Sequence, residues 1–186
     1  MQRRSKRKEK GLKIELNLDG DGKFDIDIPN AFFSHILSSF SVFSGFDLYI
    51  KGDLENIYEL TKETAELLGE CIQDSLGGKV GIERIGFSIL PMDDALILVS
   101  VDLGGRSFCD VSLVLEEKVG DFPTELVETF FNILAAKGGM NIHIKQLSGE
   151  NTHHIIEATF KAFGKSLKMA TRETSKEIPS TKGLLE

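Results

Sequence analysis

The sequence lacks tryptophan, has only two cysteines and contains no run of about 18 consecutive apolar residues, the length that a membrane-spanning helix requires. Its first residues, MQRRSKRKEKG, lack the apolar segment of a secretory signal peptide. Cys71 and Cys109 fit no CxxC spacing and are too few for a disulfide framework, so we expect two buried free thiols. These absences favour a cytoplasmic protein with no membrane partner.

The composition that remains is that of one folded domain. The 186 residues are 41% hydrophobic, and at about 150 residues per domain they predict a single unit over residues 1–186. A chain of this length buries roughly 70% of the surface that its unfolded form exposes. It therefore needs no disulfide to be stable.

Charge is distributed unevenly along the chain. The net charge is -7, but within residues 1–10 six basic side chains against Glu9 give +5, which leaves -12 on the remainder. Such an acidic body repels nucleic acid, so we expect no nucleic-acid partner. The basic arm over residues 1–10 is predicted to be a solvated, partly mobile terminus; the alternative is that it reaches a phosphorylated small molecule in a nearby pocket.

Hydrophobic periodicity predicts the same order of elements twice. In the first half, alternation over 12–18 and 24–28 around DGDG predicts a β-hairpin, followed by a helix, a strand and a second helix over 31–43, 46–51 and 60–76. A connecting strand near 85–90 is followed by strands, a helix, a strand and a helix over 95–103, 106–115, 122–137, 140–147 and 152–170.

The two halves also overlay in sequence. A shift of 95 residues places Gly69 on Gly164 and Thr64 on Thr159. We predict two pseudo-repeats, about 11–86 and 94–178. The predicted fold class is α+β: each repeat is a small, mainly antiparallel sheet with helices on one face, and the two repeats pack helix to helix.

The HHIIE segment at the start of the last helix is the main candidate for a metal site. His153 and Glu157 lie at i,i+4 on one helical face, where an imidazole and a carboxylate suit Zn, Mn, Fe or Ni. His154 is turned away by about 100°, toward a different ion or a neighbouring chain. The alternative is a set of ordinary polar side chains at an exposed helix start. A cap from Asn151 or Thr152 favours the site over this alternative, because it makes the helix start rigid.

A second group of polar residues suits a phosphate. Guanidinium groups bind phosphate oxygens in a bidentate way, and ammonium groups bind them as point charges. Taken singly, each of these residues fits ordinary surface charge better than a phosphate site. The candidates are Arg84, Arg106, Lys161, Ser180 and Lys182.

These segments together resemble the imidazoleglycerol-phosphate dehydratase family, the metal-dependent lyases of histidine biosynthesis. LNLDGDGK, PMDDAL, VDLGGRSF, GENTHHIIEATFKAFGKSL and IPSTKG carry the resemblance, which extends from about Lys8 to Leu185. It implies a duplicated α+β fold, a homo-oligomeric cage of 24 subunits, and Mn²⁺ ions held at subunit interfaces by two His-His-Glu motifs, one in each repeat. The implied reaction dehydrates imidazole glycerol phosphate, the phosphorylated imidazole substrate, to imidazole acetol phosphate.

The second family motif is present as His153, His154 and Glu157. His35 matches a further histidine of the family, but its acidic neighbour is replaced by Ser34. The resemblance therefore implies a metal site that includes these three histidines and Glu157.

The first family motif is altered. The positions of its two histidines and its glutamate hold Tyr58, Glu59 and Lys62, and Thr129 stands where the family has another histidine. An ammonium at a ligand position repels a cation. Glu59 is our remaining candidate ligand in this region, because Glu59 and Glu63 form an i,i+4 carboxylate pair.

The phosphate side of the resemblance is complete. All five phosphate candidates named above match the family's phosphate-binding positions. Glu9 falls where the family has a glutamate implicated in proton transfer, and Asp93 matches another acidic position. The implied catalytic residues are Glu9, Asp93 and Glu157, whereas His143, in an alternating strand, is predicted to be structural.

Three hypotheses follow. The chain is a working dehydratase whose Mn²⁺ site is built from the remaining ligands, or a non-catalytic relative that keeps the fold and the phosphate pocket, or a catalyst of another reaction on a phosphorylated small molecule. Metal content and metal-dependent turnover distinguish the first hypothesis from the second.

Overall fold

The structure, a computed structural model, describes residues 3–180. Lys182 lies outside the described residues. The first half contains β1 (Arg4–Glu9), β2 (Leu12–Asn17), β3 (Phe24–Asp27), α1 (Ala31–Ser44), β4 (Asp47–Lys51) and α2 (Ile57–Leu76). The second half contains β5 (Ile85–Met92), β6 (Ala95–Asp102), β7 (Phe108–Ser112), β8 (Lys118–Val119), β9 (Phe122–Pro123), α3 (Glu125–Gly138), β10 (Asn141–Ser148) and α4 (Thr152–Ala170).

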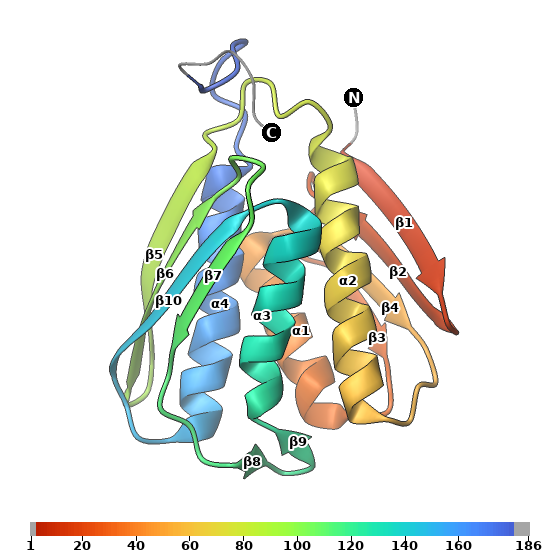
Figure 1. Cartoon of the computed structure of the whole chain (residues 1–186), viewed down its shortest axis with the longest axis vertical. Coiled ribbons are helices and arrows are strands. Elements are labelled where there is room, and N and C mark those ends of the chain that lie inside the picture. The colour runs from red at the N-terminus through yellow and green to blue at the C-terminus, as the bar shows by residue number, and fades with distance from the viewer. Residues whose placement is uncertain (1–2, 181–186) are drawn as a thin grey trace.

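The two halves have the same topology. The strand order is β1-β2-β4-β3 in one sheet and β5-β6-β10-β7 in the other, and the last pair of each sheet, β3 with β4 and β7 with β10, is parallel. The sheets lie on the outside, and the helices lie between them (Figure 1). Helix α1 packs against α4, and α2 packs against α3. The predicted α+β class with two repeats packed helix to helix is confirmed.

The helix layer is closed by aromatic packing and by glycine. Phe40 of α1 stacks on Phe163 of α4 with ring centroids 5.4 Å apart, and both side chains are fully buried. A Cβ at Gly164 would lie 2.8 Å from the carbonyl oxygen of Phe40, and a Cβ at Gly69 would lie 3.0 Å from that of Leu134. The overlay of these two glycines thus reflects the same close helix–helix approach in each repeat.

The predicted hairpin of residues 12–18 and 24–28 was wrong. Strand β2 pairs with β1 and β4, whereas β3 pairs only with the far side of β4, in parallel. The second half repeats this arrangement, because β10 lies between β6 and β7. Alternation identifies a strand but not its partner. Strand β4 lies between β2 and β3 because it brings a matching apolar face to the centre of the sheet, where Leu48 and Ile50 are fully buried.

The prediction of a mobile basic arm was also wrong over the described residues. Residues 4–9 form edge strand β1, joined to β2 by a turn in which Lys10 has φ 45° and Gly11 has φ 85°. Arg7 Nε donates a 2.8 Å hydrogen bond to Asp74 at the end of α2. Because β5 matches β1 in its sheet, each repeat starts one strand earlier than the predicted boundaries near residues 11 and 94.

No helix among residues 3–180 is long and apolar enough to cross a membrane. Both cysteines are free; Cys71 is buried and Cys109 is half-buried. Burial raises the pKa of the Cys71 thiol to about 11 and that of Cys109 to about 12. Both therefore stay protonated and unreactive near neutral pH.

Candidate active site

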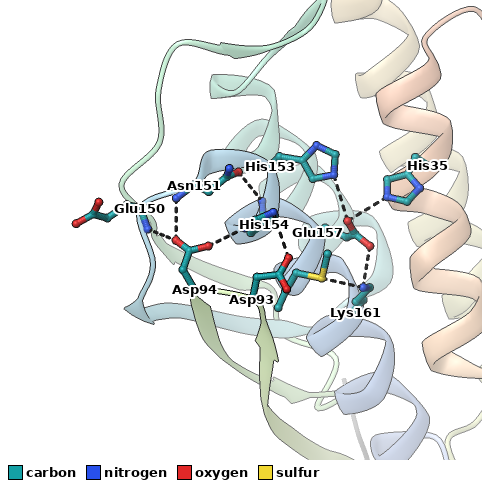
Figure 2. Close-up of polar contacts among 10 residues, drawn as sticks. His35, Asp93, Asp94, Glu150, Asn151, His153, His154, Glu157 and Lys161 are labelled. Carbon is teal, nitrogen blue, oxygen red and sulfur yellow. Dashed lines mark hydrogen bonds and ion pairs between the residues drawn. The ribbon is translucent and has the colours of Figure 1, made fainter.

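Three potential metal ligands meet between α1 and the first turns of α4. His35 Nε2 lies 3.1 Å from Oε2 of Glu157, and His153 Nε2 lies 3.2 Å from the same oxygen (Figure 2). One ligand atom from each of the three residues lies within 4.8 Å of the others. Two imidazoles and one carboxylate are a donor set for a divalent transition metal. We call these three residues the metal cluster.

Helix capping and ring packing hold this arrangement. The Asn30 side chain accepts a 2.8 Å hydrogen bond from the amide of Phe33 and so caps α1. Asn151 caps α4 in the same way through the amide of His154. The ring of Phe32 meets that of His153 edge-on at 5.1 Å. The cluster is therefore built on two rigid helix starts, which suits a binding site.

Glu157 is the electrostatic centre of the cluster. Its side chain is only 7% exposed, and its second oxygen, Oε1, accepts a 2.7 Å hydrogen bond from Lys161 Nζ. Burial raises the pKa of Glu157, but the hydrogen bonds from Lys161 and His35 outweigh burial and lower it to about 2. The carboxylate is therefore ionised at neutral pH, with one oxygen toward the lysine and the other toward the two histidines.

His154 points away from the metal cluster, toward the β5–β6 turn. Its Nδ1 lies 2.6 Å from Asp94 Oδ1, and its Nε2 lies 3.3 Å from Asp93 Oδ2. The other Asp94 oxygen accepts hydrogen bonds from the amides of Glu150 and Asn151 at 2.6 and 3.0 Å (Figure 2). These amides and His154 hold the pKa of Asp94 well below its usual range.

Asp94 is absent from the site residues expected from the sequence. The available signal was the two-residue Asp-Asp turn between strands 85–92 and 95–102, in which Asp93 has a positive φ of 48°. In such a turn the two side chains point in different directions. Both side chains are exposed, and Asp94 makes the shorter contact with His154, at 2.6 Å.

The altered motif on α2 does not form a second cluster within residues 3–180, where the metal cluster is the one group of three or more such ligands. Glu59 is exposed at the start of α2. Glu63 is buried, and its Oε2 accepts a 2.9 Å hydrogen bond from Lys10 Nζ. The Tyr58 hydroxyl donates to Glu125 on α3 at 2.9 Å. The two carboxylates thus have different environments, since Glu59 is exposed and Glu63 is buried and paired with Lys10.

The phosphate candidates separate into two places. Arg84 binds Asp102 through Nε at 2.7 Å and Nη2 at 3.0 Å, and its Nη1 donates to the carbonyl of Pro179, next to Ser180. Arg106 is exposed in the β6–β7 loop. Lys161, by contrast, lies beside the metal cluster.

The two places are at opposite ends of α4. The amide of Arg84 bonds the carbonyl of Ala170, the last residue of the helix, whereas Glu157 is in its second turn. At about 1.5 Å per residue the helix rises about 20 Å between Glu157 and Ala170. Figure 1 shows the start of α4 at the bottom and its end at the top. Glu9 lies exposed at the end of β1, in the other sheet.

The fold and the cluster together define a class: a duplicated α+β protein with a histidine–carboxylate metal-binding group. The imidazoleglycerol-phosphate dehydratase family model matches residues 29–167. The chain is 44% identical over 183 residues to the Imidazoleglycerol-phosphate dehydratase of Acetivibrio thermocellus, covering 95% of this chain and 94% of that protein. The chain belongs to the imidazoleglycerol-phosphate dehydratase family.

Solved structures agree with this assignment. The chain is similar to the crystal structure of imidazoleglycerol-phosphate dehydratase from Staphylococcus aureus, with a TM-score of 0.85 and 33% identity over 94% of this chain and 100% of that one. The structure of IGPD from Pyrococcus furiosus gives a TM-score of 0.81 and 36% identity over 97% of this chain and 100% of that one. The family predicted from the motifs is confirmed.

Proposed function

We propose that the chain is an imidazoleglycerol-phosphate dehydratase, a carbon–oxygen lyase that removes water from imidazole glycerol phosphate to give imidazole acetol phosphate in histidine biosynthesis. Family membership supports the reaction. The single observation that most supports catalysis is the metal cluster of His35, His153 and Glu157, in which the carboxylate is ionised. We also propose that the protein works in the cytoplasm.

The residues present fit a divalent metal ion, and we propose Mn²⁺. Three protein ligands leave coordination positions open for a substrate, as in catalytic rather than structural metal sites. A bound ion would act as a Lewis acid that stabilises negative charge on the substrate's imidazole ring. Because Lys161 occupies Oε1 of Glu157, the other oxygen, which faces the two histidines, would be the one to hold an ion.

Nearby acidic groups supply the proton transfers. Dehydration requires removal of a proton from carbon and donation of a proton to the departing hydroxyl. Asp93 is exposed, lies 3.3 Å from His154, and is the proposed proton carrier on this side. Asp94 accepts from His154 and so holds the ring in one orientation, with Nε2 toward Asp93. Glu9 is the proposed carrier contributed by another copy of the chain, because it lies in the other sheet.

We propose that the active site is completed between subunits. The substrate, an imidazole ring with a three-carbon phosphorylated chain, is far shorter than the separation of about 20 Å between the metal cluster and Arg84 along α4. A substrate at the metal cluster and Lys161 of one copy would then have its phosphate bound by a neighbouring copy. The phosphate-binding residues of that copy are Arg84, Arg106, Ser180 and Lys182. Family resemblance implies a cage of 24 such subunits.

An exposed apolar face supports assembly. On β5, residues Ile85, Phe87 and Ile89 are each more than half exposed, on the face opposite Gly86, which contacts α4. Phe108, on the same sheet, is also more than half exposed. Exposed apolar side chains in a row along an edge strand, as on β5, are typical of a protein interface.

We further propose one metal ion per chain. Tyr58 and Lys62 of the first repeat stand at the positions that match His153 and Glu157, and Thr129 of the second repeat stands at the position that matches His35. The Tyr58 hydroxyl is bonded to Glu125, and Lys62 is a cation, so this place favours no second ion. The altered motif thus reduces the metal content and leaves the α1–α4 cluster as the site of the reaction.

The test is turnover of the EDTA-stripped, assembled protein on imidazole glycerol phosphate before and after Mn²⁺ is added. We expect Mn²⁺-dependent turnover, about one bound Mn²⁺ per chain by elemental analysis, and loss of both in His153→Ala. Glu59→Gln is the matched control, because Glu59 is exposed and outside the cluster; it should keep both. No turnover in a folded, assembled protein would refute the proposal in favour of a non-catalytic relative.

A further inference from the structure

Lys79, in the loop between α2 and β5, is a buried cation that the catalytic proposal does not use. Its relative exposure is 3%, and its Nζ has no hydrogen-bond partner among residues 3–180. Lysine is almost never fully buried unless it is paired. The loop conformation is specific, since Lys79 has φ 55° and its amide bonds the carbonyl of Leu76. The side chain is therefore held inside by the fold.

The surroundings of Lys79 carry an excess of positive charge. Burial lowers the pKa of Lys79, Asp102 raises it, and Arg84 lowers it, so both side chains lie within electrostatic range. Asp102 is already bound by Nε and Nη2 of Arg84. Lys79 therefore lies within electrostatic range of a second cation and of one carboxylate, which Arg84 already binds.

The C-terminal segment closes over the same loop. The carbonyl of Gly81 accepts hydrogen bonds from the amides of Thr174 and Ser175. The amide of Gly81 donates to the backbone carbonyl of Glu177 at 2.9 Å. Two residues after Glu177, the carbonyl of Pro179 accepts a 2.9 Å hydrogen bond from Nη1 of Arg84. The loop of Lys79 and residues 178–180 are thereby held together beside the guanidinium of Arg84.

We propose that Lys79 is a further phosphate-binding residue, and that Lys79 and Arg84 together hold the dianionic phosphate of the substrate. The identity of the ligand rests on the proposed function, whereas the cationic site rests on the buried lysine. An unpaired buried ammonium costs free energy of folding. A phosphate dianion offsets that cost, because it supplies the charge that Asp102 alone does not.

The proposal predicts that one substitution has different effects on stability and on phosphate binding. Lys79→Met keeps the length and the apolar stem but removes the charge. Without phosphate, this variant should be at least as stable as the unmodified protein, because no partner is lost and a buried charge is removed. With phosphate, it should bind more weakly. A purely structural lysine would give the reverse pattern, with stability reduced and binding unchanged.

The experiment measures thermal unfolding and calorimetric binding of inorganic phosphate by the metal-free full chain in a phosphate-free buffer. We expect Lys79→Met to raise the Kd for phosphate at least tenfold without lowering the Tm. Lys79→Arg, which keeps the charge, should stay within about threefold of the unmodified protein. Lys176→Met is the matched control on the neighbouring C-terminal segment, since Lys176 is exposed, and it should change neither quantity.

Three results would overturn the inference: an unchanged Kd in Lys79→Met, a lower Tm or failure to fold of that variant without phosphate, or absence of phosphate binding by the unmodified protein. The measurement needs neither metal nor turnover. A protein that binds phosphate through Lys79 but does not dehydrate the substrate would therefore refute the proposed function alone. A protein that dehydrates the substrate but whose phosphate affinity does not depend on Lys79 would refute only this inference.

Discussion

The substitution Glu157→Gln tests the metal cluster most directly, because one carboxylate joins all its members. Glu157 accepts from Lys161 through Oε1 and faces His35 and His153 through Oε2. Glutamine keeps the size of the side chain and one acceptor oxygen but removes the negative charge. The two histidines are about half exposed, so the main energetic loss is the interaction with Lys161, whose side chain is 15% exposed.

The magnitude follows from that one contact. A hydrogen bond to a charged group contributes about 1.5–3 kcal/mol, and the amide oxygen retains part of it, so we expect a loss of about 2 kcal/mol. For a domain of this size, that corresponds to a fall in Tm of about 6 °C. The loss should depend on pH. The pKa of Glu157 is lowered to about 2, so the carboxylate stabilises the fold above its unfolded pKa of about 4.3, and this contribution disappears as pH falls toward about 2.

The assay is differential scanning calorimetry of both proteins with EDTA and with Mn²⁺, at pH 7 and at pH 3. At pH 7 with EDTA the variant should unfold earlier, and at pH 3 the difference should shrink. Mn²⁺ should raise the Tm of the unmodified protein but not that of Glu157→Gln. Equal stabilisation of both proteins by Mn²⁺ would refute the assignment of the metal cluster, and equal Tm values in EDTA would refute the energetic role of the contact with Lys161.

Three further predictions address the fold around the site. Gly86→Ala should lower the unfolding free energy by more than about 3 kcal/mol in urea titrations, since its Cβ would lie 1.9 Å from the Ser166 carbonyl oxygen; a smaller loss would mean that β5 and α4 separate easily. Asp47→Asn should destabilise at pH 7 and progressively less below about pH 4, because loop amides and Asn17 lower the pKa of this carboxyl despite its burial; a pH-independent loss would contradict this. Glu125→Gln should lower the ultraviolet titration midpoint of Tyr58, whose pKa the Glu125 hydrogen bond raises, and an unchanged midpoint would exclude that bond.

The sequence predicted local structure well because local structure depends on neighbours within a few residues. The 3.6-residue periodicity of 60–76 and 152–170 identified the helices that become α2 and α4. The i,i+4 spacing of His153 and Glu157 placed both on one face, where the structure brings them within 3.2 Å. It could not reveal that β4 separates β2 from β3, because alternation within a strand carries no information about its partner.

By itself, then, the sequence determined the order of the four helices and of most strands, the duplication, the family and the amino acids available for chemistry. Only the tertiary structure decided which of them meet. Packing of α1 on α4 brought His35 to His153 and Glu157, and left His154 to the two aspartates of the β5–β6 turn. The C-terminal segment bonds to Gly81 of the α2–β5 loop, in which Lys79 is buried. Such contacts join residues far apart in the chain, and their geometry is set by the packing of whole elements rather than by local spacing.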